Sequence, residues 1–229
     1  MIHLRQLILT LITALVLMVP AGFANALDNS GKSEQMGEQM AMATFAGGCF
    51  WCMEYRFEKV PGVNKVFSGY TGGSEDAPKY KQVAYGKTGH VEAIRIYYNP
   101  AVISYEGLLQ VYWRMTDPTD NKGQFVDRGK QYRPVIFYHD ARQKNIAKRS
   151  LAVLRRSLRF KKPITLAIEP ASKFWLAEDY HQDFYKRQSI KFRNFRYSNP
   201  RGVFIKKIWG PDLKIDYSKY RPNSERWSF

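Results

Sequence analysis

Cysteine is scarce in this chain of 229 residues, since Cys49 and Cys52 are the only two and stand three positions apart. A disulfide across so short a loop restrains the unfolded chain little, so it would stabilise the fold weakly compared with a long-range bridge. Histidine is also rare, and the four histidines lack the paired spacing that a structural zinc site uses. These shortages argue against a structural disulfide and against a metal site, and they leave redox chemistry as the role of the pair.

Long apolar runs are also missing. The run at residues 7–20 provides about 14 residues where a membrane-spanning helix needs about 20. A basic residue precedes this run and an A-x-A cleavage pattern follows it at residues 24–26, which is typical of a secretory signal peptide. We therefore expect a cleaved signal peptide at 1–26 and a periplasmic or secreted protein, with an uncleaved anchor as the alternative. A flexible lead-in at 27–41 and one domain with a basic C-terminal extension at 42–229 should follow.

Acidic residues are few, because 20 Asp and Glu face 36 Lys and Arg and the formal net charge is +16. Removal of residues 1–26 takes away Arg5 alone among the charged residues, which leaves +15. The basic residues are spread through amphipathic segments instead of forming a tail, so we interpret them as a solvated cationic surface and expect no nucleic acid partner. A weak contact with an anionic membrane surface, or a cationic binding module for such surfaces, is the alternative.

Turn and periodicity signals divide the domain into strands and helices without the strict alternation of a doubly wound parallel sheet. Ser104 and Asp140 stand where helix N-caps are expected. The expected strands are 42–47, 63–73, 90–98, 134–139 and 163–169, and the expected helices are 49–60, 105–115, 141–159 and 174–187. This order predicts an α+β layer architecture with a split βαβ (ferredoxin-like) core.

Cys49 follows two glycines at the predicted start of a helix, where free N–H groups and the helix dipole favour a thiolate. We therefore expect a lowered pKa for this thiol. Cys52 lies one helical turn further on, within the distance that a disulfide tolerates. Phe50 and Trp51, between the two cysteines, are either core aromatics or the wall of an apolar pocket beside the thiolate.

Glu92 lies in an alternating strand on the same face as Ile94 and Ile96. A carboxyl group on an apolar face is costly unless it is protonated or hydrogen-bonded, so Glu92 is a candidate general acid, and an edge-strand glutamate in water is the alternative. His90 and His181 are candidate bases for a Cys–His nucleophile, or ordinary surface or core histidines.

Four segments together resemble the successive sequence blocks of the peptide methionine sulfoxide reductase A family. The resemblance extends from Thr44 to Gly210 and rests on "GGCFWCMEYRFEKVPGVNKVFSGYTGG", "YGKTGHVEAIRIYYNP", "DRGKQYRPVIF" and "AEDYHQDFY". It implies an α+β fold, a two-layer sandwich with a mixed β-sheet. It also implies an enzyme that reduces the S epimer of methionine sulfoxide, free or in proteins, and so repairs oxidative damage.

The resemblance also implies a role for each of nine residues. The catalytic set is Cys49 as nucleophile, Glu92 as proton donor, Tyr80 and Tyr132 as hydrogen-bond donors to the sulfoxide oxygen, and Cys52 as resolving cysteine. The substrate-binding set is Phe50, Trp51, Asp127 and His181. The sequence departs from the family pattern at Lys79, where threonine is frequent, at Pro134, where serine is frequent, and in a C-terminal tail without cysteine.

The implied cycle passes through a sulfenic acid on Cys49 and a Cys49–Cys52 disulfide that a thioredoxin or thioredoxin-like reductant recycles. We expect no cofactor, no metal and a monomer. The alternative function is a thioredoxin-like thiol-disulfide oxidoreductase, because a C-x-x-C pair at a strand-to-helix junction is also typical of that class.

Overall fold

The computed structural model describes residues 40–222. The predicted signal peptide at 1–26 and residues 27–39 of the predicted lead-in lie outside the described residues, as does the segment 223–229. The first strand begins at Ala41, one residue before the expected start of the domain. Within the described part, no helix combines the length and the apolar character that crossing a bilayer requires.

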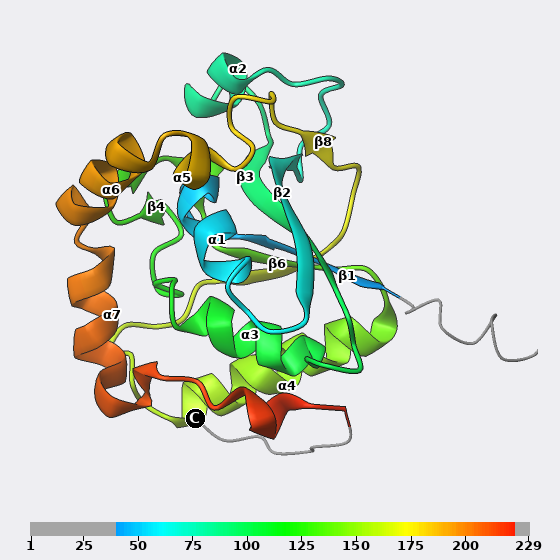
Figure 1. Cartoon of the computed structure of the whole chain (residues 1–229), viewed down its shortest axis with the longest axis vertical. Helices are drawn as coiled ribbons and strands as arrows, with labels where there is room; N and C mark the ends of the chain where they lie inside the picture. Colours follow the sequence, from blue (N-terminus) through cyan, green and yellow to red (C-terminus); the bar gives the residue numbers. More distant parts are fainter. Residues whose placement is uncertain (1–39, 223–229) are drawn as a thin grey trace, which may run out of the picture. The chain divides into compact units, whose positions relative to one another are not determined.

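A mixed sheet forms the centre of the described part, and it confirms the predicted α+β class (Figure 1). The strands lie in the order β7-β6-β1-β3-β2-β8, and β6 pairs with β7 in parallel while the other neighbours are antiparallel. Their bounds are β1 (Ala41–Ala46), β2 (Val63–Thr71), β3 (Val91–Tyr98), β6 (Val135–Tyr138), β7 (Ala167–Pro170) and β8 (Trp175–Leu176).

Three helices pack on one face of this sheet: α1 (Phe50–Phe57), α3 (Tyr105–Trp113) and α4 (Ala141–Arg156). The predicted caps of the last two are confirmed. The hydroxyl of Ser104 accepts a hydrogen bond from the Gly107 N–H at 3.2 Å, and the carboxylate of Asp140 accepts one from the Gln143 N–H at 2.7 Å. Alternate residues of the strands supply the apolar surface that these helices bury.

Short elements at one end of the sheet carry several predicted site residues. They are α2 (Tyr80–Ala84), β4 (Gly123–Gln124), β5 (Asp127–Arg128) and the 3₁₀ helix η1 (Lys130–Tyr132). The loop before β4 is held by Gln124, whose side-chain oxygen accepts the Asp117 N–H at 2.8 Å and whose amide donates to the Asp117 carbonyl at 2.8 Å. Local side-chain bonds of this kind give an irregular segment a defined conformation.

The predicted helix at 174–187 is wrong. This segment instead forms β8, a series of turns and the short helix α5 (Phe184–Arg187). The Gln182 side chain accepts a hydrogen bond from the Ser68 N–H at 3.0 Å and donates to the Ser68 carbonyl at 2.9 Å. These bonds satisfy backbone groups of β2 next to the two residues that pair with the short strand β8, and they outweigh the local preference for helix.

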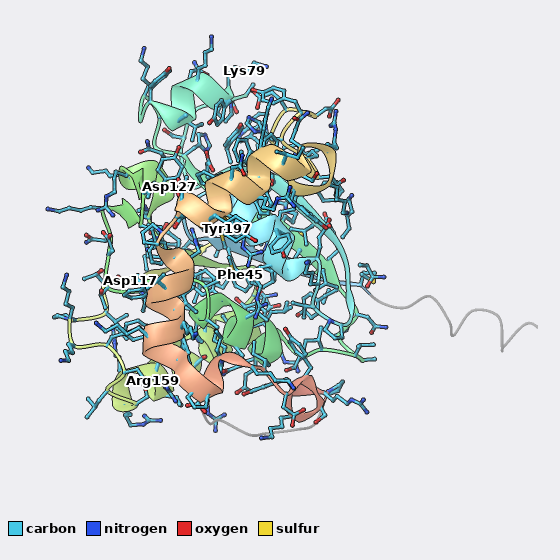
Figure 2. All side chains as sticks on the ribbon, turned by 60° about the vertical axis from the view of Figure 1, so that its left-hand side comes forward. Phe45, Lys79, Asp117, Asp127, Arg159 and Tyr197 are labelled. Atoms are coloured by element: carbon cyan, nitrogen blue, oxygen red, sulfur yellow. The ribbon has the colours of Figure 1, made fainter. Side chains whose placement is uncertain are left out.

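The C-terminal extension contains helices α6 (Ser189–Ser198) and α7 (Arg201–Trp209), followed by η2 (Gly210–Leu213) and η3 (Tyr217–Tyr220). Figure 2 shows α6 and α7 (orange) crossing in front of α1 (cyan) and α3 (green). Trp209 is buried and its indole N–H donates to the Trp113 carbonyl at 3.2 Å, so the extension packs on the domain through a fixed contact.

Candidate active site

The loop between β1 and α1 presents Cys49, and the first turn of α1 presents Cys52; both are buried and both are free thiols. Gly48 has a φ of +88°, a conformation that side chains disfavour, and a Cβ there would lie 2.6 Å from an Arg201 nitrogen. A Cβ on Gly47 would lie 2.5 Å from the Thr116 methyl group. The glycines are therefore required because protein side chains pack closely against this loop.

Cys49 occupies the N-cap position of α1, as predicted. The first N–H groups of the helix, however, point to carboxylates. The Cys49 N–H donates to Asp127 Oδ2 at 3.4 Å, and the Phe50 N–H donates to Glu92 Oε2 at 3.1 Å. The expectation of a lowered Cys49 pKa is wrong for this structure, because burial raises it, as do the hydrogen bond to Cys52 and the neighbouring acids.

Glu92 is buried on β3, with 2% of its surface exposed, so the alternative of an edge glutamate in water is excluded. Burial raises the pKa of Glu92 from its ordinary 4.5 to about 8, against the opposing effect of the Phe50 hydrogen bond. The carboxyl group therefore holds its proton near neutral pH. A protonated acid beside a cysteine is the arrangement that a general acid requires.

Two tyrosine hydroxyls belong to the same site. Tyr132 shares a hydrogen bond with Glu92, and Tyr80 interacts electrostatically with both Glu92 and Cys49. Burial raises the pKa of Tyr80 to about 12, and it raises that of Tyr132 further. Both hydroxyls therefore keep their protons and remain hydrogen-bond donors. Asp127 is half-buried and its pKa is raised, again by burial.

An aromatic cluster adjoins the Cys49 side of the site. The Trp51 ring stacks on Phe184 with centroids 3.8 Å apart, and its indole N–H donates to His181 Nδ1 at 3.1 Å. The His181 ring also lies 5.0 Å from Phe50 and 4.3 Å from Tyr80. The structure thus brings Phe50, Trp51 and His181 together, as the sequence predicted, and leaves Trp51 partly exposed.

Neither histidine is arranged as a base for Cys49. Burial lowers the pKa of His181 to about 4, so its ring is neutral and accepts the Trp51 hydrogen bond. His90 accepts the Gly73 N–H at Nδ1, 3.2 Å away, and its Nε2 lies 2.8 Å from the Glu75 carbonyl. The proposed Cys–His nucleophile is therefore wrong, and His90 holds a loop.

Cys52 faces a different environment from Cys49. Its backbone N–H donates to the Cys49 carbonyl at 3.1 Å, so the two residues form one tight turn. The hydrogen bond from the Cys49 thiol lowers the pKa of Cys52, and the positive charges of Arg201 and Arg196 lower it further. In the reduced protein, negative charge on the pair is therefore favoured at Cys52.

Comparison with known proteins bears on the identity of this site. A profile of the peptide methionine sulfoxide reductase family matches residues 41–213. The chain belongs to this family. The peptide methionine sulfoxide reductase MsrA of Listeria monocytogenes is 55% identical over 172 residues, which cover 75% of this chain and 97% of that relative. The MsrA/MsrB protein of Vibrio cholerae is 45% identical over 199 residues, 87% of this chain and 53% of the relative.

Solved structures of the same family are also similar. Reduced Mxr1 from Saccharomyces cerevisiae has a TM-score of 0.58 and 31% identity, covering 65% of this chain and 85% of its own. The methionine sulfoxide reductase A of Corynebacterium diphtheriae has a TM-score of 0.57 and 25% identity, covering 65% of this chain and 74% of its own. Both likenesses agree with the α+β fold of this reductase family member.

Two residues of this member of the peptide methionine sulfoxide reductase family were not singled out from the sequence. The Glu178 carboxylate accepts the Tyr80 N–H at 3.0 Å and the Tyr70 hydroxyl at 2.8 Å, so it positions α2 beside the site. Arg201 donates to the Gly47 carbonyl at 3.2 Å and to the Met115 carbonyl at 2.6 Å. Glu178 lies in the block "AEDYHQDFY" and could have been chosen. Arg201 lies 154 positions from Gly47, and no local signal reveals its contact.

Proposed function

We propose that this protein reduces the S epimer of methionine sulfoxide, free or in proteins, to methionine, and that Cys49 and Glu92 perform the reaction. The observation that carries the proposal is the meeting of these two residues at the first turn of α1, where the Phe50 N–H donates to the Glu92 carboxyl group at 3.1 Å. Membership of the peptide methionine sulfoxide reductase family and the adjoining aromatic cluster of Phe50, Trp51 and His181 support it.

The first step is attack of the Cys49 sulfur on the sulfoxide sulfur, while the Cys49 thiol proton passes to Cys52, whose pKa is lowered by the hydrogen bond from that thiol. Glu92 gives its proton to the sulfoxide oxygen, and the hydroxyls of Tyr80 and Tyr132 stabilise the charge that develops there by hydrogen bonds to that oxygen. The hydroxyl group then moves from the substrate sulfur to the Cys49 sulfur as the bond between the two sulfurs breaks, so methionine leaves and Cys49 holds a sulfenic acid. Trp51, a member of the aromatic cluster, contacts the methyl group of the substrate.

The second step forms a disulfide. The Cys52 sulfur attacks the Cys49 sulfur, and the sulfenic hydroxyl group takes the Cys52 thiol proton and departs as water, so the enzyme holds a Cys49–Cys52 bond. The contact between the two thiols and the lowered pKa of Cys52 support this step. A thioredoxin-like dithiol, itself oxidised to a disulfide, returns both cysteines to thiols. The alternative of a general thiol-disulfide oxidoreductase leaves the protonated Glu92 beside Cys49 without a role.

The reaction is tested with purified protein, each epimer of a methionine sulfoxide peptide and a dithiol. We expect turnover of the S epimer by the wild type and none by Cys49→Ser. The Cys52→Ser variant should turn over slowly with dithiol, and without dithiol it should still yield about one methionine per enzyme. Turnover by Cys49→Ser at the wild-type rate would contradict the assignment.

We propose further that β6, β1, β3 and β2 form a split βαβ core of the ferredoxin-like type within a two-layer sandwich. Support comes from the pairing, because β1 and β2 each lie antiparallel to β3 and α1 connects them across it. β6 lies antiparallel to β1 on its other side. A chain truncated before β7 should retain a near-native circular dichroism signal from the sheet, and loss of that signal would contradict an independent core.

We propose export of the protein with cleavage after Ala26, since residues 24–26 carry the A-x-A pattern. The mature protein then acts in an oxidising compartment as a monomer and depends on a thioredoxin-like donor there. N-terminal sequencing of protein from fractionated cells is expected to begin at Leu27. Mature protein that kept Met1 would contradict the proposal.

A further inference from the structure

A cavity of about 210 Å³ lies against Cys52 on the side of the C-terminal helices. Cys52, Tyr55 and Arg56 line it from α1, and residues of α6 and α7 close it from the opposite side, consistent with the crossing of these helices in Figure 2. Cys49 does not line it. The cavity therefore gives access to one sulfur of the pair and is separate from the site that holds Glu92.

The polar lining of this cavity is basic. It contains no acidic residue and four arginines, which are Arg56, Arg114, Arg196 and Arg201. Within the described part of the chain, no carboxylate forms a salt bridge with any of the four. Four positive charges around one small volume repel one another unless an anion neutralises them.

Arg201 adds a second and independent observation. It is 8% exposed, and its Nε is buried without a hydrogen-bond partner, while its other nitrogens donate to the carbonyls of Gly47 and Met115. The Arg201 guanidinium also lies over the Phe125 ring, with its Cζ 4.8 Å from the ring centroid, and it interacts electrostatically with Asp127 without forming a salt bridge. The cost of burying its charge is therefore compensated only in part. A ligand carboxylate, which can accept two N–H bonds from one guanidinium, would compensate this cost.

We propose that this cavity binds the carboxylate of a low-molecular-weight thiol and directs its sulfur to Cys52. The proposal rests on the proposed function, since it describes how the Cys49–Cys52 disulfide is reduced. The volume suits a small molecule, the arginines select a negative charge, and Cys52 is the sulfur that the cavity reaches. The protein therefore accepts electrons from a small anionic thiol in addition to a dithiol protein.

The exchange proceeds in two balanced steps. The thiolate of the small molecule attacks the Cys52 sulfur, the Cys49–Cys52 bond breaks, and Cys49 leaves as a thiolate that takes a proton. A second molecule of the same thiol then attacks the sulfur of the bound one, which releases a small-molecule disulfide and the Cys52 thiolate. Two thiols are oxidised and one protein disulfide is reduced.

The test compares three monothiols of different charge as reductants of the full-length protein. The disulfide is made with diamide and verified by mass, and its reduction is followed by alkylation of the released thiols. We expect 3-mercaptopropionate to react about tenfold faster than 2-mercaptoethanol, and cysteamine to react slowest, when each rate is divided by the thiolate concentration. Propionate, which lacks a thiol, should slow 3-mercaptopropionate by competition.

The variant Arg56→Gln/Arg196→Gln should lose most of this preference, and the control Arg155→Gln/Arg156→Gln, which removes the same charge from an exposed end of α4, should keep it. Equal thiolate rates in the wild type, or a preference that survives in the first variant, would overturn the proposal. A third outcome would also overturn it: if the Arg56→Gln/Arg196→Gln variant were reduced more slowly only by an acidic dithiol protein, the arginines would form a protein interface.

Failure of this test and failure of the proposed function are distinguishable. Diamide forms the disulfide without methionine sulfoxide, so an inactive reductase could still show the charge preference. An active reductase could equally reduce its disulfide with no preference. Absence of a Cys49–Cys52 bond after diamide treatment would overturn the cavity proposal directly.

Discussion

The two cysteines of the C-x-x-C pair occupy different electrostatic environments although they share one helical turn. Cys49 lies beside the carboxyl groups of Glu92 and Asp127, whereas Cys52, which the charge of Asp127 also reaches, lies beside arginines of the C-terminal helices. The spacing brings the sulfurs together, and the surrounding fold gives each its own role. In the proposed mechanism the acidic side supplies a proton to the sulfoxide oxygen, and the basic side favours a thiolate and an anionic reductant.

Replacement of Glu92 by Gln removes the proton donor of the acidic side, and it should have the largest effect on the rate of methionine formation. The amide keeps the shape and can accept the Phe50 hydrogen bond, but it has no proton to give to the sulfoxide oxygen. Loss of a general acid typically costs a factor of about 10²–10⁴. Single-turnover formation of methionine in the absence of dithiol measures this step apart from disulfide reduction.

A matched control is Glu106→Gln. Glu106 is also buried, and burial raises its pKa to about 7, but it belongs to α3 and interacts with Arg149. We expect near wild-type single-turnover rates for this variant. A similar loss in both variants would mean that removing any buried carboxyl group disturbs the fold, and the acid role of Glu92 would lose its support.

The effect of Glu92 on the pH dependence of the unfolding free energy should be intermediate in size, and it tests the acidic side of the comparison separately from activity. The folded pKa of Glu92, about 8, lies above its ordinary 4.5, so folding favours the protonated form. Its contribution is fully present below pH 4.5 and is lost as pH rises through 8. Relative to Glu92→Gln, the wild type should lose at most about 1.4 kcal/mol of unfolding free energy for each pH unit in this window. Urea unfolding at several pH values measures the difference, and parallel curves for the two proteins would contradict the shift.

Local sequence signals explain the parts of the fold and site that could be predicted. The caps at Ser104 and Asp140 act within three residues, and the face of Glu92 follows from the two-residue period of a strand. Each of these features is decided by near neighbours, so the chain sequence shows it directly. The role expected of each site residue still awaits the tests above.

Two wrong predictions, the helix at 174–187 and the lowered Cys49 pKa, concern features that contacts between distant residues decide. The segment 174–187 has a helical pattern, yet Gln182 bonds to Ser68, 114 positions away, and the segment runs as turns. The expectation of a lowered Cys49 pKa assumes an exposed and free helix end, whereas the fold buries the thiol and Asp127 accepts the Cys49 N–H. Contacts between distant parts of the chain decide both features, and a single sequence does not display them.

The smallest effect on activity is expected in the aromatic cluster, on the acidic side of the site. Trp51→Phe keeps an aromatic ring opposite Phe184 but removes the indole N–H that donates to His181 Nδ1. A lost hydrogen bond that leaves a buried acceptor unpaired costs about 1 kcal/mol, or roughly fivefold. Because the role proposed for the Trp51 ring is to bind the substrate methyl group and not to transfer a proton, the loss should appear mainly in KM, with kcat nearly unchanged. Trp175→Phe on β8 is the control and should leave both constants unchanged. A fall in kcat of Trp51→Phe at constant KM would instead place Trp51 among the groups that stabilise the transition state. Substrate binding by the aromatic cluster and transition-state stabilisation by the acidic groups would then not be separate roles.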